Sequence, residues 1–427
     1  MKILTFCIAA VFYINFTVAF SAPFLPSTKN CTISTVPSSK NLGENLGKNK
    51  IKMAYKSVGD KGFDAANTII KCKDGNFILL GRTDSYGTGD MNMSAVKVDV
   101  NGNVIWNKNY GAEESEEGYA GVETTDGGFI FAGYSDSYGA GSDIKDGWIV
   151  RTDAKGVRIW DKTFGSNQSI DEIYSIITTD EGNYLILMNS IPIETGKSDI
   201  ILLEIDVKGE TIWKKSFGGT SSEQGKSIAK IEGGYLIAGH VEGETMTKWD
   251  MLLIQVDKQG NKKWEKTYGG GDNEMANVVK VMPSGNILIA GYSYTYAQGS
   301  HDAWIVCTDK NGKKIWNKNF GGLSTDEAFD VLVTANSEII LIGYTDIYKA
   351  DEYGNNISPL SNEIMINKLD AKGTEIWTRT LGGDKDQVAK AGVIADDGSF
   401  VLAGYTNENM DTKNVDMLIL KLSADGQ

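Results

Sequence analysis

The chain has 427 residues, of which 41% are hydrophobic and 23% charged, and its formal net charge is −14. An acidic surface repels phosphate backbones and no Lys/Arg cluster offsets the charge, so we expect no nucleic-acid partner. Length alone suggests two or three ordinary domains of about 150 residues. The 49 glycines against 6 prolines indicate many tight turns rather than a disordered chain.

Residues 1–21 have the pattern of a secretory signal peptide. Lys2 supplies the basic start, residues 3–20 are largely apolar, and Ser21 follows Ala19 at a small-residue cleavage site. We expect cleavage after Ser21. An uncleaved anchor is the alternative, because the apolar stretch nearly reaches bilayer-spanning length. The sequence therefore predicts a secreted protein (extracellular, periplasmic or on the cell surface) with no membrane insertion after cleavage.

Residues 22–50 are polar and rich in Ser, Asn, Lys and Pro, which predicts a flexible linker. Cys7 leaves with the signal, and the three remaining cysteines are too few and odd in number for a disulfide framework. Cys72 and Cys307 lie in strand-like runs, where cysteine usually acts as a small buried hydrophobe. Whether these two or Cys31 form a disulfide stays open.

From residue 51 onward the chain consists of seven internal repeats of roughly 52 residues. In six repeats a tryptophan marks the fourth apolar run: Trp106, Trp160, Trp213, Trp264, Trp316 and Trp377. In six repeats a glycine ends the second run: Gly81, Gly133, Gly239, Gly291, Gly343 and Gly404, and in the third repeat Asn189 is assigned to that place.

The fifth repeat illustrates the pattern that all seven share. Runs rich in Val, Ile, Tyr and Trp cover 277–281, 287–292, 303–308 and 314–320, separated by Gly and Asp/Asn turns. Four short strands per repeat of this length predict a propeller blade. Stacked in a circle, blades cover one another's faces. We therefore predict an all-β, seven-bladed β-propeller with four-stranded antiparallel blades, in one domain over residues 51–427.

The two ends of this region complement each other. The last repeat stops at residues 423–427, where its tryptophan strand should begin. Residues 51–58, followed by Gly59, align with 105–110 and Gly111 of the first repeat. We predict that residues 51–58 supply the outer strand of blade seven and so close the ring.

Two recurring acidic positions have architectural interpretations. Asp-x-x-Gly precedes the fourth strand at Asp99, Asp153, Asp206, Asp257, Asp309 and Asp370. An EF-type calcium loop needs acidic ligands at alternate positions, which these turns lack, so we predict hairpin turns in which Asp accepts backbone N–H groups and Gly has a positive φ. They are similar to the Asp-box of sialidase propellers, with Gly and Trp one residue further along, but four scattered arginines do not match the sialidase arginine cluster.

A second acidic position opens the third strand, at Asn92, Asp146, Asp199, Asp250, Asp302, Glu363 and Asp416. We interpret it as a backbone-capping position, and a cation-binding ring is the alternative. The apolar runs and the six tryptophans are interpreted as inter-blade core, with a sugar-stacking platform as the alternative for the tryptophans.

Residues that break the repeat are the better candidates for function, because a residue type present in every blade serves the architecture. At the end of the second strand tyrosine recurs, but Arg82, Ser190 and His240 stand in three blades. Long loops at 135–146 and 345–362 open on the same face. The candidate ligand-binding residues are Arg82, Tyr134, His240, Tyr292, Tyr344, Tyr348, Tyr353 and Tyr405. Functionless loop variation is the alternative.

We predict no catalytic residue, cofactor or metal site. The two histidines, His240 and His301, occupy different repeat positions, and G-x-S-x-G, H-E-x-x-H and P-loop motifs are absent from the sequence. The predicted function is a non-enzymatic, monomeric binding propeller with a protein or carbohydrate ligand. A polysaccharide-acting hydrolase or lyase that uses loop carboxylates is the alternative, because carboxylates are abundant.

Residues 126–135, 146–153 and 159–165 resemble the β-propeller repeats of secreted bacterial and archaeal surface proteins, with the pattern DGG-[FY]-I-x-AGY, D-x-W-[IL]-V-x-TD and IW-x-K-x-[FY]-GG. The resemblance covers about residues 51–427. It implies the propeller fold and no particular catalytic residue. Blade three departs most, with Met188-Asn-Ser190 in place of Ala-Gly-Tyr.

Overall fold

The computed structural model describes residues 27–34, 51–60, 62–87, 90–140, 144–243, 248–350, 356–383, 385–409 and 414–426. These residues form strands and turns, with no helix among them. Accordingly, the described part of the chain contains no helix long and apolar enough to cross a membrane. The predicted signal peptide, residues 1–21, and the candidate residue Tyr353 lie outside the described residues.

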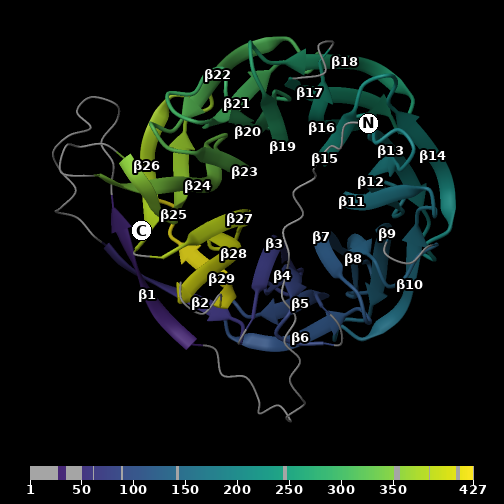
Figure 1. Cartoon of the computed structure of the whole chain (residues 1–427), viewed down its shortest axis with the longest axis horizontal. Helices are drawn as coiled ribbons and strands as arrows, with labels where there is room; N and C mark the ends of the chain where they lie inside the picture. Colours follow the sequence, from purple (N-terminus) through teal and green to yellow (C-terminus); the bar gives the residue numbers. More distant parts are fainter. Residues whose placement is uncertain are drawn as a thin grey trace, which may run out of the picture.

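Seven four-stranded antiparallel blades stand around a common axis (Figure 1). Blades one to three consist of β3 (Asp64–Lys71), β4 (Phe77–Thr83), β5 (Asn92–Val98) and β6 (Val104–Tyr110), then β7 (Glu116–Glu123), β8 (Phe129–Ser135), β9 (Asp146–Thr152) and β10 (Arg158–Phe164), then β11 (Ser169–Thr178), β12 (Tyr184–Pro192), β13 (Asp199–Ile205) and β14 (Thr211–Phe217).

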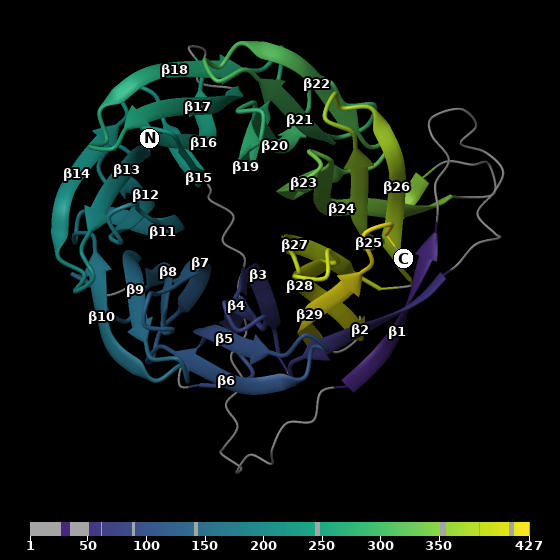
Figure 2. The same cartoon turned by 180° about the vertical axis from the view of Figure 1, so that it is seen from behind.

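Blades four to seven repeat this order. They consist of β15 (Glu223–Ile231), β16 (Gly234–Glu242), β17 (Trp249–Asp257) and β18 (Lys262–Tyr268), then β19 (Glu274–Val281), β20 (Ile287–Ser293), β21 (Asp302–Thr308) and β22 (Lys314–Phe320), then β23 (Asp326–Val333), β24 (Ile339–Ala350), β25 (Asn356–Leu369) and β26 (Glu375–Gly382), then β27 (Gln387–Ile394), β28 (Phe400–Asn409) and β29 (Asn414–Leu422). The first strand of each blade is innermost, and the fourth lies at the rim (Figure 2).

The N-terminal strand β2 (Ile51–Val58) completes blade seven. It pairs antiparallel with β29, with Tyr55 opposite Leu420 and Val58 opposite Met417. The fold prediction is thereby confirmed, including ring closure by residues 51–58. This pairing holds the first and last segments of the propeller together in one sheet. The ring is therefore closed, and no blade face is left uncovered.

A further strand, β1 (Ser27–Ser34), lies within the stretch interpreted as a flexible linker. It pairs along its length with β2, and its last residues, 32–34, pair with residues 380–382 of β26. Blades six and seven therefore share one nine-stranded sheet. The linker interpretation missed this strand because its polar sequence lacks the apolar alternation of a half-buried strand, and its pairing partners are residues far along the chain.

The core is divided among the junctions between blades. The described residues form seven hydrophobic clusters, each built from two adjacent blades. The predicted role of the six repeat tryptophans as inter-blade core is confirmed, since each is half-buried and packs on one of these clusters. Cys72 and Cys307 are buried, unpaired with one another and part of different clusters.

Each rim tryptophan also packs against a turn glycine of the next blade. A Cβ atom built on Gly260 of blade four would lie 2.6 Å from the indole of Trp213 in blade three, and one on Gly209 would lie 2.9 Å from Trp160. Six blades make this contact, with the glycine at positive φ in the Asp-x-x-Gly turn or, in blade seven, its Ser423 counterpart. Glycine is required here twice over, for its conformation and for the close approach of the indole.

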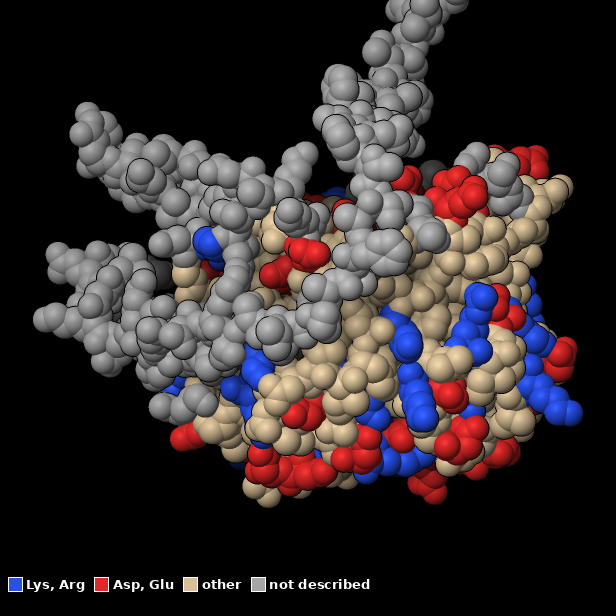
Figure 3. Space-filling model, turned by 90° about the horizontal axis from the view of Figure 1, so that it is seen from below, with Lys and Arg blue, Asp and Glu red and all other residues tan. Residues whose placement is uncertain are grey.

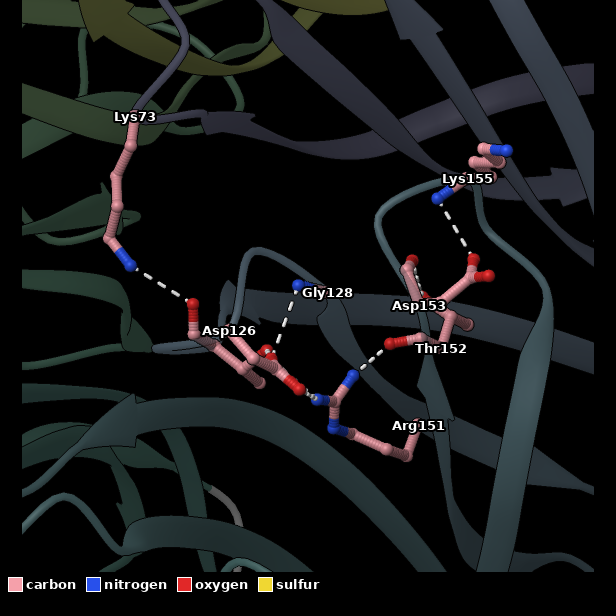
Figure 4. Close-up of polar contacts among 8 residues, drawn as sticks. Lys73, Asp126, Gly128, Arg151, Thr152, Asp153 and Lys155 are labelled. Carbon is pink, nitrogen blue, oxygen red and sulfur yellow. Dashed lines mark hydrogen bonds and ion pairs between the residues drawn. The ribbon is translucent and has the colours of Figure 1, made fainter.

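The Asp-x-x-Gly turns are hairpin turns, as predicted. The Asp153 carboxylate accepts the backbone N–H group of Lys155 (Figure 4) and that of Val157, each at 2.8 Å. The other five aspartates accept the same two N–H groups in their own blades. The same face carries the turns between first and second strands, where Arg151 pairs with Asp126 at 2.6 Å.

The segment 345–362, expected to be the longest loop, is largely strand. The ladder between β24 and β25 continues through Thr345 opposite Glu363 to Ala350 opposite Asn356. Along the rim near β6, basic and acidic side chains are interspersed rather than segregated (Figure 3). The acidic excess therefore forms no single-sign surface on that side.

Candidate functional site

One residue from each second strand lies at the same height, opposite the residue that follows the recurring acidic position of the third strand. We call this set the strand-end ring: Arg82, Tyr134, Asn189, His240, Tyr292, Tyr344 and Tyr405. The pairing corrects the sequence alignment in blade three, because Met188, not Asn189, occupies the glycine position and pairs with Ile173. Asn189 rather than Ser190 is therefore the member from that blade. An irregular repeat had hidden this one-residue shift.

The innermost strand of every blade contains a β-bulge at one position. In β7, for example, Gly118 pairs with Gly133 and Ala120 with Ala132, so that Tyr119 is an extra residue. We call the seven bulge residues the axial ring: Asn67, Tyr119, Tyr174, Lys226, Asn277, Phe329 and Lys390. A bulge redirects the side chain of its extra residue. Sequence reasoning did not single out these residues.

The axial-ring side chains face the propeller axis. Lys226 of blade four interacts electrostatically with Glu327 of blade six, and Lys390 of blade seven with Glu117 of blade two. These blades are not neighbours in the ring (Figure 1). Interactions that pass over an intervening blade require side chains directed inward from the innermost strands.

The axial ring divides into two arcs with the same order of residue types. In the first arc Asn67 donates to Glu117 at 2.8 Å, Tyr119 stacks on Tyr174 with centroids 5.1 Å apart, and the Lys226 ammonium lies 3.7 Å from the Tyr174 centroid. The order is asparagine, aromatic residues, lysine.

The second arc repeats it. Asn277 donates to Glu327 at 2.9 Å, and the Lys390 ammonium lies 3.4 Å from the Phe329 centroid. Both asparagines also donate to the backbone carbonyl of the residue after that glutamate. Two arcs of matching construction indicate a selected arrangement rather than drift among seven blades.

The three glutamates beside the axial ring have donors within the protein. Glu117 accepts from Asn67, Tyr119 and Arg82, the last at 3.5 Å. Glu172 accepts from Tyr174 at 2.7 Å and from Lys145 at 2.8 Å. Glu327 accepts from Asn277. Burial raises the pKa of Glu327.

The two lysines differ from the glutamates in their bonding. Burial lowers the pKa of both Lys226 and Lys390 to about 8, against the opposing effect of nearby glutamates. Within the described residues neither ammonium donates a hydrogen bond, and each rests on an aromatic face. Both lysine side chains are half-buried, and removing part of the water around an ammonium costs free energy that a hydrogen-bond acceptor would offset.

The structure separates the predicted site residues by exposure. Tyr134 and His240 are buried, while Arg82, Tyr292, Tyr344 and Tyr405 are half-buried. Tyr134 lies under the Lys145 ammonium at 3.9 Å.

His240 bonds Gln224 at 3.3 Å and lies edge-on to Trp249, and burial lowers its pKa to about 3. It is therefore neutral at physiological pH. Tyr348 belongs to β24 and lies away from the strand-end ring in the ladder, opposite Pro359.

The acidic position that opens the third strand packs against the connection between blades. A Cβ on Gly165 would lie 1.7 Å from Asp146 Oδ1, and one on Gly218 1.8 Å from Asp199 Oδ1. Asp146 caps the Ala140 N–H at 2.6 Å, which agrees with the capping interpretation for that blade.

A second acidic set, missed in the sequence, opens the first strand: Asp64, Glu116, Asp171, Glu223, Glu274 and Asp326, with Gln387 in blade seven. Glu274 caps the Gly270 N–H at 2.8 Å. Burial raises the pKa of Glu223 to about 7. The recurrence of an acidic residue at the same place in successive repeats is the sequence signal that could have revealed this set.

Comparison with known proteins gives distant likenesses. No protein-family model matches the chain. The chain is 25% identical over 286 residues to the regulatory protein FlaEY of Caulobacter vibrioides, a match that covers 58% of this chain and 30% of FlaEY. The chain thus spans less than a third of that relative.

Among solved structures, the Pan2 WD40 domain of Neurospora crassa aligns with a TM-score of 0.49 and 13% identity, covering 84% of this chain and 89% of that one. The β-propeller domain of the trilobed protease of Pyrococcus furiosus aligns with a TM-score of 0.44 and 10% identity, covering 86% and 96%. Likenesses this distant do not identify a function, and the fold rests on the strand pairing itself.

The described residues contain no group of three or more His, Cys, Asp or Glu placed to hold one metal ion. His240 and His301 belong to different blades, and His301 packs on Tyr292 with ring centroids 4.5 Å apart. The chemistry on offer around the axis is therefore that of ammonium, guanidinium, phenol and carboxylate groups.

Proposed function

We propose that this chain is a secreted or cell-surface binding propeller, without catalytic activity, whose ligand docks around the strand-end ring. The observation that carries the proposal is the variation at that position. The glycine before it recurs in six blades, yet the position itself holds Arg, Tyr, Asn or His. A rigid scaffold that presents unlike side chains around one axis is suited to recognition.

The N-terminal sequence supports export. Residues 1–21 have the composition of a signal peptide. The ligand is a protein or a glycan. Repeat propellers use the axial face for both, because loops and strand ends converge there while the rim is occupied by blade-to-blade packing.

The test is a paired substitution of half-buried strand-end residues, Arg82→Ala with Tyr344→Ala. Glycan and protein ligands selected with the purified full chain should lose at least tenfold affinity for this variant. The matched control is Ile315→Ala, an exposed rim residue (52%), which should bind like the parent. Equal affinity of the double variant and the parent, with equal melting temperatures, would show that the ligand docks elsewhere.

The rival function, a polysaccharide hydrolase or lyase, is tested with the same preparation. Incubation with acidic and neutral polysaccharides should release no reducing ends and no unsaturated products. Suppose instead that such products are released, that the activity co-purifies with the protein, and that Glu327→Gln abolishes it. That result would replace the binding proposal with catalysis by an axial carboxylate.

A further inference from the structure

Within the described residues, the two lysines are the charged side chains of the axial ring that make no hydrogen bond. Glu117, Glu172 and Glu327 already accept from protein donors. Lys226 and Lys390 carry three N–H donors each, and in the described part of the chain neither donates one. What a ligand can add there is a group that accepts hydrogen bonds.

The aromatic faces of the axial ring are already covered. Tyr174 has Tyr119 stacked on it at 5.1 Å from one neighbouring blade and Lys226 at 3.7 Å from the other. Phe329 has Tyr344 at 5.7 Å and Lys390 at 3.4 Å. Sugar recognition in propellers relies on open aromatic faces, so these rings favour a charged group over a stacked sugar.

The charges at the axis favour one negative charge over two. Arg82 pairs with Glu117 and Lys145 with Glu172, which leaves Lys226 and Lys390 facing Glu327, the one glutamate of the three without an ion pair among the described residues. A dianionic phosphate would feel the repulsion of all three glutamates twice over. A carboxylate keeps the same acceptor oxygens with half of that repulsion.

We propose that the axial ring binds carboxylates of an acidic peptide, from Glu or Asp side chains or a chain terminus, at the ammonium groups of Lys226 and Lys390. The proposal rests on the proposed function in that it uses the same face, and it adds the ligand class. The lysines act as donors, while Tyr174 and Phe329 hold them in place through their ring faces. The peptide backbone then extends across the strand-end ring.

The protonation state of the lysines supports this role. With pKa values lowered to about 8 they are still charged at pH 7 but lose the proton at modestly higher pH. The titratable and charged groups around them are Glu117, Glu172, Glu327, Arg82, Lys145, His240, Tyr119 and Tyr174. Between pH 7 and 9.5 the histidine stays neutral, because burial lowers its pKa to about 3, and the two tyrosines keep their protons, because burial raises their pKa values. Binding should therefore fall over this interval as the lysines are neutralised.

The experiment uses the full purified chain and a fluorescein-labelled hexaglutamate peptide, with hexaglutamine as the uncharged probe. Anisotropy titrations at pH 7 should show binding of hexaglutamate only. Lys226→Met and Lys390→Met should each weaken it about tenfold or more, since each removes a charge-assisted hydrogen bond. Lys214→Met and Lys318→Met, on exposed rim lysines, should leave it unchanged. Raising the pH to 9.5 should weaken binding by the parent and by each single variant, and should leave the residual binding of the Lys226→Met/Lys390→Met double variant unaltered.

Each of the following results would overturn the proposal. They are no binding of hexaglutamate up to millimolar concentration, equal binding of hexaglutamine, unchanged affinity in both axial variants, or tighter binding of an oligogalacturonate of the same charge, which would mark an acidic-sugar site. Competition by inorganic phosphate at lower concentration than by acetate would do the same. These failures are separable from failure of the proposed function, because the Arg82/Tyr344 variant is measured with ligands selected on the full chain, whereas the lysine variants are measured with hexaglutamate.

Discussion

Replacing Lys226 by methionine should stabilise the protein. The ammonium of Lys226 is held at the axis on the face of Tyr174, with Glu172 and Glu327 near enough to act on its pKa but not bonded to it. Burial costs the charged form free energy, which is why its pKa falls from the ordinary 10.5 to about 8. Methionine fills similar volume without a charge.

The size of the gain follows from that pKa. A fall of roughly 2.5 pH units at about 1.4 kcal/mol per unit gives an upper bound of about 3 kcal/mol. Solvent screening at this half-buried position removes part of it, and the lost contact with Tyr174 costs about 1 kcal/mol. We expect a net gain of about 1–2 kcal/mol at pH 7, or about 1–3 °C in melting temperature for a domain of this size.

The gain should depend on pH in one direction. Below pH 8 Lys226 is protonated in both the folded and the unfolded state, so the penalty is constant. Between about 8 and 10.5 the folded protein has released the proton and the unfolded chain still holds it, so the stability of the parent rises with pH. The advantage of the methionine variant should therefore shrink over this interval.

The assay is thermal unfolding of parent, Lys226→Met and the rim control Lys214→Met at pH 7 and pH 10. The control should match the parent at both. A variant less stable than the parent at pH 7, or an advantage that does not diminish at pH 10, would refute the assignment of Lys226 as a buried, unbonded cation. Stabilisation together with loss of carboxylate binding is the signature of a residue retained for function at a cost in stability.

Three further variants test the structure, and one mass measurement tests export. Deleting residues 51–58 removes the outer strand of blade seven and should lower the melting temperature by about 10 °C or more; an unchanged value would contradict the closure. Trp213→Ala should lower the free energy of unfolding by about 2–3 kcal/mol, because its inter-blade contacts are lost. The exposed Ile212→Ala should lower it by about 0.5 kcal/mol or less. Equal losses for the two variants would contradict a stabilising role for the tryptophan contact. Glu223→Gln should stabilise at pH 8 but not at pH 4, because burial raises the pKa of Glu223 to about 7 and the folded state bears the charge only above it; the same effect at both values would disprove it. The intact mass of the exported protein should correspond to a chain that begins at Ala22, and retention of residues 1–21 would indicate an anchor.

Much of the fold was predictable because its signals are local and repeated. A strand of seven residues with apolar alternation, followed by a Gly or Asp turn, is legible in one repeat and is then checked six more times. The turn aspartates and the tryptophans were correctly assigned to architecture for the same reason. Even ring closure was accessible, because the missing strand of blade seven had a visible counterpart at residues 51–58.

The candidate site was only half accessible. The strand-end residues could be found because they interrupt a repeat, but blade three was misaligned by one residue, since Met188 replaces the glycine that marks the register. Strand β1 was missed because its pairing with β26 joins residues about 350 positions apart, and no local pattern records such a partner.

By itself, the sequence determined the number of blades, the strands within them and the closure of the ring, since these depend on short-range periodicity. The tertiary structure alone decided which side chains meet at the axis. Lys226 and Lys390 look like ordinary strand lysines until the bulges of the innermost strands turn them inward. A bulge adds one residue without changing the apolar pattern around it, and the neighbours that make a lysine costly or useful come from other blades.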